Sequence, residues 1–148
     1  MKIVSKSAEQ TGEIGQNLAK EIVDLENDGK EAIVIALEGE LGAGKTTLTQ
    51  GFAKGLGIEE KITSPTFVIF KIYSVPKGKH FKKMIHVDCY RLKDYTDLKV
   101  IGFNKILEDN ANIILIEWSD RVKEILPNKH IKVHIDHIEE SVRKILIN

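Results

Sequence analysis

The sequence predicts an α/β fold, a three-layer sandwich in which helices cover both faces of a mixed parallel and antiparallel central sheet. Three observations lead to this prediction. Short apolar runs at 32–37 and 113–116 have the length and composition of buried parallel strands. Segments with apolar residues every three or four positions stand between the predicted strands. A glycine-rich turn at 39–47 joins the first of these strands to a helix.

The composition fits one ordinary domain. The chain has 148 residues, enough to bury a full core, so we expect residues 1–148 to form a single domain. Its formal net charge is zero, which argues against binding nucleic acid mainly by charge. Cys89 is the sole cysteine, so no internal disulfide is possible, as suits a reducing, cytoplasmic location. The chain lacks the apolar runs of a signal peptide or a membrane span, and we expect no membrane association.

The N-terminal part predicts a strand followed by a helix. Residues 2–5 have the composition of a short strand. Ser7 and Gln10 resemble a capping box, which predicts that a helix begins here. The apolar stripe of that helix comprises Ile14, Leu18, Ile22 and Leu25. Turn-forming residues at 27–29 are expected to end it.

Past the glycine-rich turn, Leu48, Phe52 and Leu56 recur at the spacing of one helix face. Residues 66–73 and 84–89 then read as strands joined by a turn at 76–79. A helix in two pieces is predicted over 94–109, because Gly102 interrupts it.

The C-terminal part predicts a further strand, a short helix and a hairpin. The strand at 113–116 is followed by a helix over 120–126, which Pro127 ends. Apolar and polar residues alternate over 131–136, the period of a half-exposed strand. Residues 142–147 are expected to pair with it.

Residues 39–47, GELGAGKTT, match the phosphate-binding pattern G-x-x-x-x-G-K-[ST]. Such a loop turns backbone N–H groups toward nucleotide phosphates. Lys45 is expected to reach the β- and γ-phosphates, and the Thr46 hydroxyl to bind Mg²⁺. The predicted nucleotide-binding residues of the loop are Gly39, Glu40, Leu41, Gly42, Ala43, Gly44, Lys45, Thr46 and Thr47. With a strand before it and a helix after it, the loop predicts a P-loop NTPase-like sandwich.

Two other nucleotide-binding patterns are not met. The dinucleotide pattern G-x-G-x-x-G would need glycine where Thr47 stands. The guanine-recognition pattern N-K-x-D fails after both Asn104 and Asn128, so ATP is favoured over GTP. A glycine turn that enters a helix without any ligand remains the alternative.

Two acidic residues join Lys45 in the predicted catalytic set. Glu117 ends an apolar strand and is expected to hold Mg²⁺, and a surface glutamate just past a strand is the alternative. Asp88 lies in an apolar-flanked strand, where aspartate is unfavourable, so a role in orienting water, as a base or beside the metal is predicted. The alternative is a strand-end aspartate satisfied by Arg91.

Three weaker signals remain. Thr66 follows the loop at the place where P-loop proteins carry a switch hydroxyl, although an ordinary turn explains it equally well. A basic segment at 77–83 fits either a solvated hairpin or a nucleic-acid contact. The histidines His130, His134 and His137 suggest a zinc site only weakly, because they do not share one strand face.

Four blocks of the sequence resemble the TsaE (YjeE) family, the small P-loop ATPases of tRNA threonylcarbamoyladenosine biosynthesis. They are the loop at 39–47, the S-P-T-F segment at 64–67, the H-x-D-x-Y-R segment at 86–91 and the pair Glu117-Trp118. These blocks run over most of the chain, and its length is that of the family.

The resemblance implies a cytoplasmic bacterial ATPase that binds ATP and Mg²⁺ and supports two partner proteins, TsaB and TsaD. In the family these partners modify the adenosine beside the tRNA anticodon, so contact of this chain with tRNA is expected to be indirect. The resemblance assigns phosphate and Mg²⁺ binding to Lys45 and Thr46, the metal also to Glu117, and hydrolysis to Asp88. Further positions carried over are Thr11 near the base, Thr66 as a switch, Trp118 beside the site, and Arg143.

The expected reaction is Mg²⁺-assisted attack of water on the γ-phosphate of ATP. Arg91 and Arg121 are candidates for an arginine that stabilises the transition state, which a partner could supply instead. Two alternatives stay open. One is a small-molecule kinase, although the chain has no arginine-rich lid, and the other is a non-catalytic ATP-dependent switch.

Overall fold

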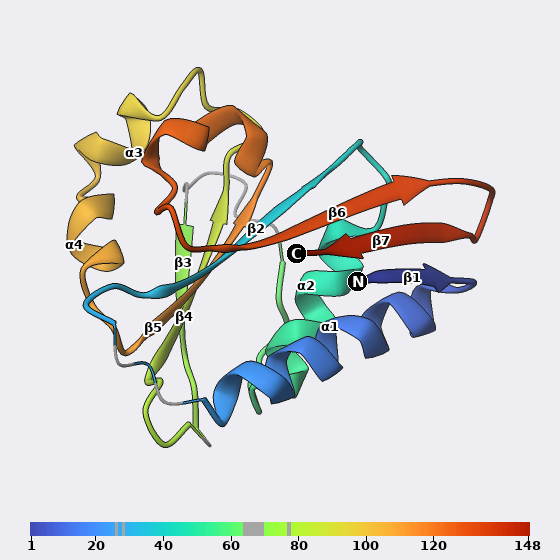
Figure 1. Cartoon of the computed structure of the whole chain (residues 1–148), viewed down its shortest axis with the longest axis horizontal. Coiled ribbons are helices and arrows are strands. Elements are labelled where there is room, and N and C mark those ends of the chain that lie inside the picture. Colours follow the sequence, from blue (N-terminus) through green and yellow to red (C-terminus); the bar gives the residue numbers. More distant parts are fainter. Residues whose placement is uncertain (26, 28, 64–69, 77) are drawn as a thin grey trace.

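The computed structural model describes residues 1–25, 27, 29–63, 70–76 and 78–148. Its centre is a seven-stranded sheet with the order β1-β7-β6-β2-β5-β4-β3 (Figure 1). The strands are β1 (Lys2–Ser5), β2 (Ile33–Gly39), β3 (Phe70–Ser74), β4 (Lys83–Asp88), β5 (Asn112–Glu117), β6 (Ile131–His137) and β7 (Arg143–Ile147). The inner strands β4, β5, β2 and β6 run parallel. Antiparallel pairs flank them, β3 with β4 on one side and β7 with β6 and β1 on the other.

Helices cover both faces of this sheet, which confirms the predicted α/β sandwich. One face carries α1 (Ala8–Val23) and α2 (Lys45–Gly55), and the other carries α3 (Thr96–Val100), α4 (Phe103–Leu107) and the 3₁₀ helix η1 (Ser119–Ile125) (Figure 1). All six residues of β5 are buried, because this central strand has covering layers on both sides. Within the described parts of the chain, no helix is both long and apolar enough to span a membrane.

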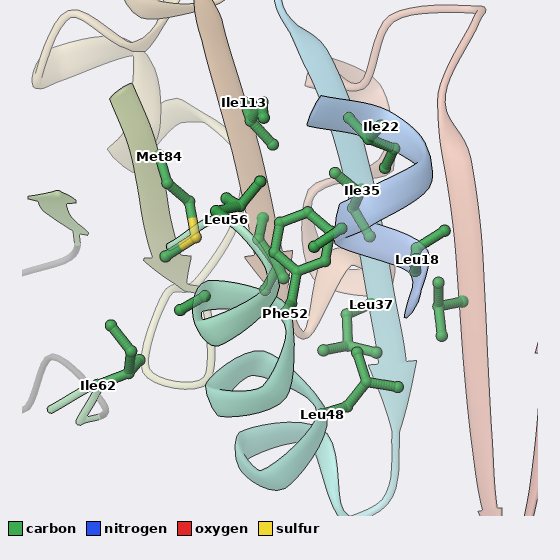
Figure 2. Close-up of a cluster of buried hydrophobic side chains, with 14 of the residues drawn as sticks. Leu18, Ile22, Ile35, Leu37, Leu48, Phe52, Leu56, Ile62, Met84 and Ile113 are labelled. Carbon is green, nitrogen blue, oxygen red and sulfur yellow. The ribbon is translucent and has the colours of Figure 1, made fainter. Parts of the chain in front are cut away.

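The larger core lies between the sheet and the pair α1 and α2 (Figure 2). The predicted stripe of α2 forms its centre, since Leu48 and Phe52 are fully buried and Leu56 is nearly so. They pack with side chains of α1 and β2, among them Leu18, Ile22, Ile35 and Leu37. The spacing of apolar residues therefore predicted this face of α2 correctly.

Helices α1 and α2 approach so closely that their backbones touch at glycines. A Cβ placed on Gly51 would lie 1.9 Å from the carbonyl oxygen of Gly12. A Cβ on Gly15 would lie 2.2 Å from the carbonyl oxygen of Leu48. Only glycine permits this approach, which brings the first turn of α1 against the start of α2.

The predicted end of the first helix was wrong. Helix α1 ends at Val23 rather than near 27–29, and Leu25 is 52% exposed instead of joining the stripe. In the loop that follows, the Asn27 side chain donates to the carbonyl oxygens of Glu31 and Asn110.

The helix predicted over 120–126 is a 3₁₀ helix, interrupted at Val122, where the backbone is not helical (φ −131°, ψ 34°). Val122 is fully buried in the second core, so tertiary packing decides its conformation. Of the strand predicted at 66–73, residues 66–69 lie outside the described part, and β3 begins at Phe70.

Candidate nucleotide-binding site

The predicted catalytic residues meet at one edge of the sheet. Strand β2 leads into the glycine-rich loop, β4 ends at Asp88 and β5 ends at Glu117. The parallel register pairs Glu117 with Leu37 on one side and with Asp88 on the other. This edge, outside the carboxyl ends of parallel strands, is where open α/β sheets bind ligands.

The loop between β2 and α2 takes a shape that requires glycine at two points. Gly44, directly before α2, has a φ of 108°, which residues with side chains rarely adopt. A Cβ on Gly39 would lie 2.6 Å from the Ile135 carbonyl oxygen of β6. Between them the Ala43 N–H donates to the Glu40 carbonyl oxygen at 3.0 Å, which closes the turn. Leu41 stands at the tip of the loop, 76% exposed.

Helix α2 begins at this loop without a side-chain cap in the described part of the chain. The N–H groups of its first turn, at Lys45, Thr46 and Thr47, have no carbonyl partner within the helix. The helix dipole adds positive potential at the same end. A phosphate group would satisfy both the open donors and the potential, so this helix start fits the predicted ligand.

The Lys45 ammonium group lies inside the loop rather than in solvent, with the residue 5% exposed. Its Nζ donates to the carbonyl oxygens of Gly39 (2.6 Å) and Glu40 (2.8 Å) and lies 4.0 Å from the centroid of the Trp118 ring. Burial lowers the Lys45 pKa, and the negative charges of Glu117 and Asp88 oppose that shift. Lys45 is thus a cation held between the loop and the two predicted acids.

Glu117 is buried, 3% exposed, so the alternative of a surface glutamate past the strand end is wrong. Its Oε2 is hydrogen-bonded to Nε2 of His86, which is fully buried on the neighbouring strand β4. With the Thr46 hydroxyl at the start of α2, the Glu117 carboxylate offers the oxygen ligands that Mg²⁺ prefers. Among the described residues, no cluster of three or more His, Cys, Asp or Glu side chains could hold a metal by itself. Mg²⁺ at a phosphate site needs none, because phosphates and water complete its shell.

The sequence predicted that Asp88 lies inside a strand. In the structure it is the last residue of β4. Its Oδ1 accepts the backbone N–H of Tyr90 at 3.0 Å, so Tyr90 fixes the direction of the carboxylate. Burial raises the Asp88 pKa, and the charge of Glu117 adds to the shift, while the Tyr90 hydrogen bond opposes it. Such an acid is a better proton acceptor than an exposed one.

A pocket lies on the other side of the loop, between the start of α1 and strand β7. Thr11, Gly44, Thr47 and Arg143 are among the residues that line it. The Thr11 hydroxyl is buried, 2.7 Å from the Ser5 hydroxyl. Arg143 donates from Nε to the Ala43 carbonyl oxygen (2.9 Å) and from Nη2 to that of Gly42 (3.3 Å). Strand β7 therefore braces the loop, a contact that no local pattern indicates.

Two aromatic rings and an arginine flank Lys45 on the side of Asp88. The rings of Tyr90 and Trp118 lie 5.1 Å apart, and the Arg121 guanidinium lies 5.4 Å from each ring centroid. Arg121 also donates to the Tyr90 carbonyl oxygen. Trp118, as the resemblance implied, adjoins the site, and its φ of 59° is the one positive value among described non-glycine residues.

Other predicted positions do not join this cluster. Thr66 lies outside the described residues. The basic residues Lys79, Lys82 and Lys83 lie at the start of β4, the opposite end of this strand from Asp88. His86 is a polar contact of the site to which the sequence assigned no role. A histidine between apolar neighbours in a predicted strand was the available signal.

Comparisons with known proteins identify the family of this chain. The family described as "Threonylcarbamoyl adenosine biosynthesis protein TsaE" matches residues 5–145. The tRNA threonylcarbamoyladenosine biosynthesis protein TsaE of Haemophilus influenzae is 35% identical over 127 residues, 86% of this chain and 76% of its own. The protein of the same name from Treponema pallidum is 33% identical over 147 residues, 99% of each chain.

A solved structure gives the same answer for the fold. The crystal structure of Bacillus subtilis YdiB superimposes with a TM-score of 0.71 at 31% sequence identity, covering 98% of this chain and 82% of that one. The loop, the two acids and the sheet order thus stand in a chain whose sequence matches one family almost from end to end. This chain belongs to the TsaE family.

Proposed function

We propose that residues 1–148 act as one Mg²⁺-dependent ATPase domain in the modification of tRNA to threonylcarbamoyladenosine. One observation carries the proposal. The uncapped start of α2 and Lys45 lie beside two buried or half-buried acids, Glu117 and Asp88, at the carboxyl ends of parallel strands. Phosphate donors, a cation and metal-binding oxygens are what phosphoryl transfer from ATP needs.

Each group has a separate task in the proposed reaction. The loop N–H groups and Lys45 bind the phosphates and stabilise the charge that develops on them. Thr46 and Glu117 would hold Mg²⁺, which when bound supplies positive charge against the β- and γ-phosphate oxygens. Asp88 orients the attacking water and accepts its proton, a task that suits its raised pKa.

The remaining predicted contacts form the outer part of the nucleotide site. Glu40 and Leu41 belong to the phosphate-binding loop itself, and the pocket beside Thr11 and Arg143 is proposed to take the sugar and base of ATP. Thr66 keeps its predicted role as a switch residue that senses the triphosphate.

We further propose that this chain works with the partners TsaB and TsaD in the cytoplasm and contacts tRNA only through them. The names of the relatives support the pathway. Arg121 donates to the Tyr90 carbonyl oxygen and packs near Trp118, contacts that direct its guanidinium away from a phosphate in the proposed arrangement. We propose that a partner supplies the catalytic arginine instead, which is typically worth ~10³–10⁵ in rate, so that the isolated chain hydrolyses ATP slowly.

Steady-state ATP hydrolysis with and without Mg²⁺ tests the proposal, measured on the chain alone and with purified TsaB and TsaD. Turnover should be slow alone, rise with the partners, and disappear in Lys45→Ala. Lys54→Ala, which removes a lysine from the other end of α2, is the matched control. Nucleotide binding without any turnover, even with both partners, would point to the switch alternative instead.

A further inference from the structure

His86 is a polar side chain in an otherwise apolar part of the structure. It lies in the middle of β4, fully buried, on the face of the strand that carries Met84 toward the larger core. Burying an imidazole costs free energy unless its nitrogen atoms find hydrogen-bond partners. An aliphatic side chain would pack here without that cost, so the histidine needs a specific reason.

Its hydrogen bonding is directed at one residue. A carboxylate that binds Mg²⁺ is ionised and can only accept, so in the metal-binding form Nε2 of His86 donates to Oε2 of Glu117. The other ring nitrogen, Nδ1, is buried and has no partner among the described residues. The one described hydrogen bond of the His86 ring is therefore the bond to Glu117.

Glu117 is the residue for which orientation matters most. It is the last residue of β5 and nearly fully buried, and the backbone partners of β5 in the sheet do not restrain its side chain. A carboxylate that binds a metal through one oxygen is commonly held by a hydrogen bond at the other. Loss of such supporting groups typically lowers metal affinity by ~10- to 100-fold.

We propose that His86 is a positioning residue, which holds the Glu117 carboxylate in one orientation and thereby sets the affinity of the site for Mg²⁺. The inference rests on the proposed function, because it assigns Glu117 to the metal. It concerns the chain's own residues and requires no contact between His86 and the nucleotide.

Two kinds of substitution separate positioning from packing. The glutamine amide in His86→Gln places an N–H where Nε2–H stands, whereas the shorter asparagine in His86→Asn cannot reach Glu117. His86→Leu removes the donor and keeps the volume. Met84→Leu, on the same face of β4, is the packing control, since neither methionine nor leucine can donate a hydrogen bond to Glu117.

The measurement is ADP affinity by titration calorimetry, over a series of Mg²⁺ concentrations and in EDTA, with melting temperature recorded for each variant. We expect His86→Leu and His86→Asn to need ~10- to 100-fold more Mg²⁺, with ADP affinity in EDTA unchanged within about twofold. His86→Gln should stay within a few-fold of the native chain, as should Met84→Leu.

Three results would overturn the inference. These are an unchanged Mg²⁺ requirement in His86→Asn, a glutamine variant as impaired as the asparagine one, or a parallel loss of affinity with and without Mg²⁺. If His86→Leu does not fold, the Gln and Asn pair still decides. If the ADP affinity of the native chain did not depend on Mg²⁺, the proposed function would be contradicted as well. If that affinity depended on Mg²⁺ but the His86 variants were unaffected, only this inference would be contradicted.

Discussion

Helices α1 and α2 lie side by side on one face of the sheet, yet their N-termini are built in opposite ways. At the start of α1 the Ser7 side chain accepts the Gln10 N–H at 3.1 Å, and the Gln10 side chain accepts the Lys6 N–H at 2.7 Å. The start of α2 has glycine at the capping position and no side-chain cap in the described part of the chain. One helix start satisfies its own donors and the other leaves them open.

The two helix starts serve different purposes, since the capped start of α1 adds stability and the open start of α2 is available to a ligand. A capped start typically stabilises a helix by ~1 kcal/mol, and α2 forgoes that contribution. Its open donors are the groups that a phosphate binds. The acids of the two regions also differ. Glu38 forms ion pairs with Lys132 and His134, whereas the negative charges of Asp88 and Glu117 lie close enough together near Lys45 that Glu117 raises the pKa of Asp88.

The largest expected effect comes from an acid at the open end. Asp88→Asn should lower partner-stimulated ATP turnover by ~10²–10⁴, because it removes the proposed base. It should also slightly raise stability at neutral pH. The folded-state pKa of Asp88 is raised, so its ionised form is less favourable in the folded chain above that pKa, and the penalty disappears below pH ~4, the unfolded value.

Hydrolysis assays and chemical denaturation at several pH values check both parts. The stability difference between Asp88→Asn and the native chain should grow as the pH rises. A substitution that loses stability at pH 7 together with turnover would mean that Asp88 serves the fold rather than the reaction.

The next effect tests the contact that ties the two helix starts together. In Gly51→Ala the new Cβ meets the Gly12 carbonyl oxygen, so α1 and α2 must separate. We expect a loss of ~1–3 kcal/mol in the free energy of unfolding, together with weaker ATP binding because Thr11 moves.

Gly12→Ala is the matched control for this pair. Its Cβ would have only the Thr47 carbonyl oxygen within reach, at 4.0 Å, and alanine favours the helix by up to ~1 kcal/mol over glycine. Urea denaturation distinguishes the two variants. Equal stability of both would show that backbone contact does not hold the helices together.

A smaller effect concerns the capped helix start. Ser7→Ala should cost ~1 kcal/mol of unfolding free energy, since the Gln10 N–H loses its partner, whereas Ser7→Asp keeps an acceptor and most of the stability. Because Ser7 also lines the pocket proposed for the sugar and base, the catalytic rate with the partners is compared at saturating ATP, where both variants should stay within about twofold of the native chain. A large fall in that rate would place the α1 cap within the reaction site and remove the contrast with α2.

The smallest effect comes from the paired charges of β2 and β6 that centre on Glu38, the residue before the loop. Hydrogen bonds to Glu38, and then to Asp136, raise the pKa of His134 despite its partial burial. Because the folded pKa lies above the unfolded value of 6.5, the contribution is complete below pH 6.5 and is lost as the pH rises through the folded pKa. His134 is 36% exposed, so solvent screening limits this to a few tenths of a kcal/mol, about 0.5 at most.

Denaturation of the native chain and of His134→Gln between pH 5.5 and about 8.5 measures the contribution of protonated His134 to the free energy of unfolding. The difference in unfolding free energy should shrink as the pH rises, and ATP turnover should not change. A difference that is constant with pH would show that the His134 contacts are not charge-dependent.

Prediction from the sequence worked where neighbours along the chain decide the outcome. The pattern of Leu48, Phe52 and Leu56 and the interruption at Gly102 were correct, because helix period and glycine conformation are local properties. The end of α1 was wrong, and the Asn27 side chain in the loop beyond it binds a carbonyl 83 positions away. The short helix before Pro127 was predicted, but its 3₁₀ form and its interruption at Val122, a side chain buried in the second core, were not.

The sequence by itself determined the phosphate-binding loop, its flanking strand and helix, and the acids that end two strands. These follow from residue types at fixed spacing, which constrain the backbone directly. Tertiary structure alone decided that His86 bonds Glu117 across 31 positions and that Arg143 braces the loop across 100. Such contacts depend on which strands become neighbours in the sheet, and strand order follows from packing the whole chain around one core rather than from any local pattern.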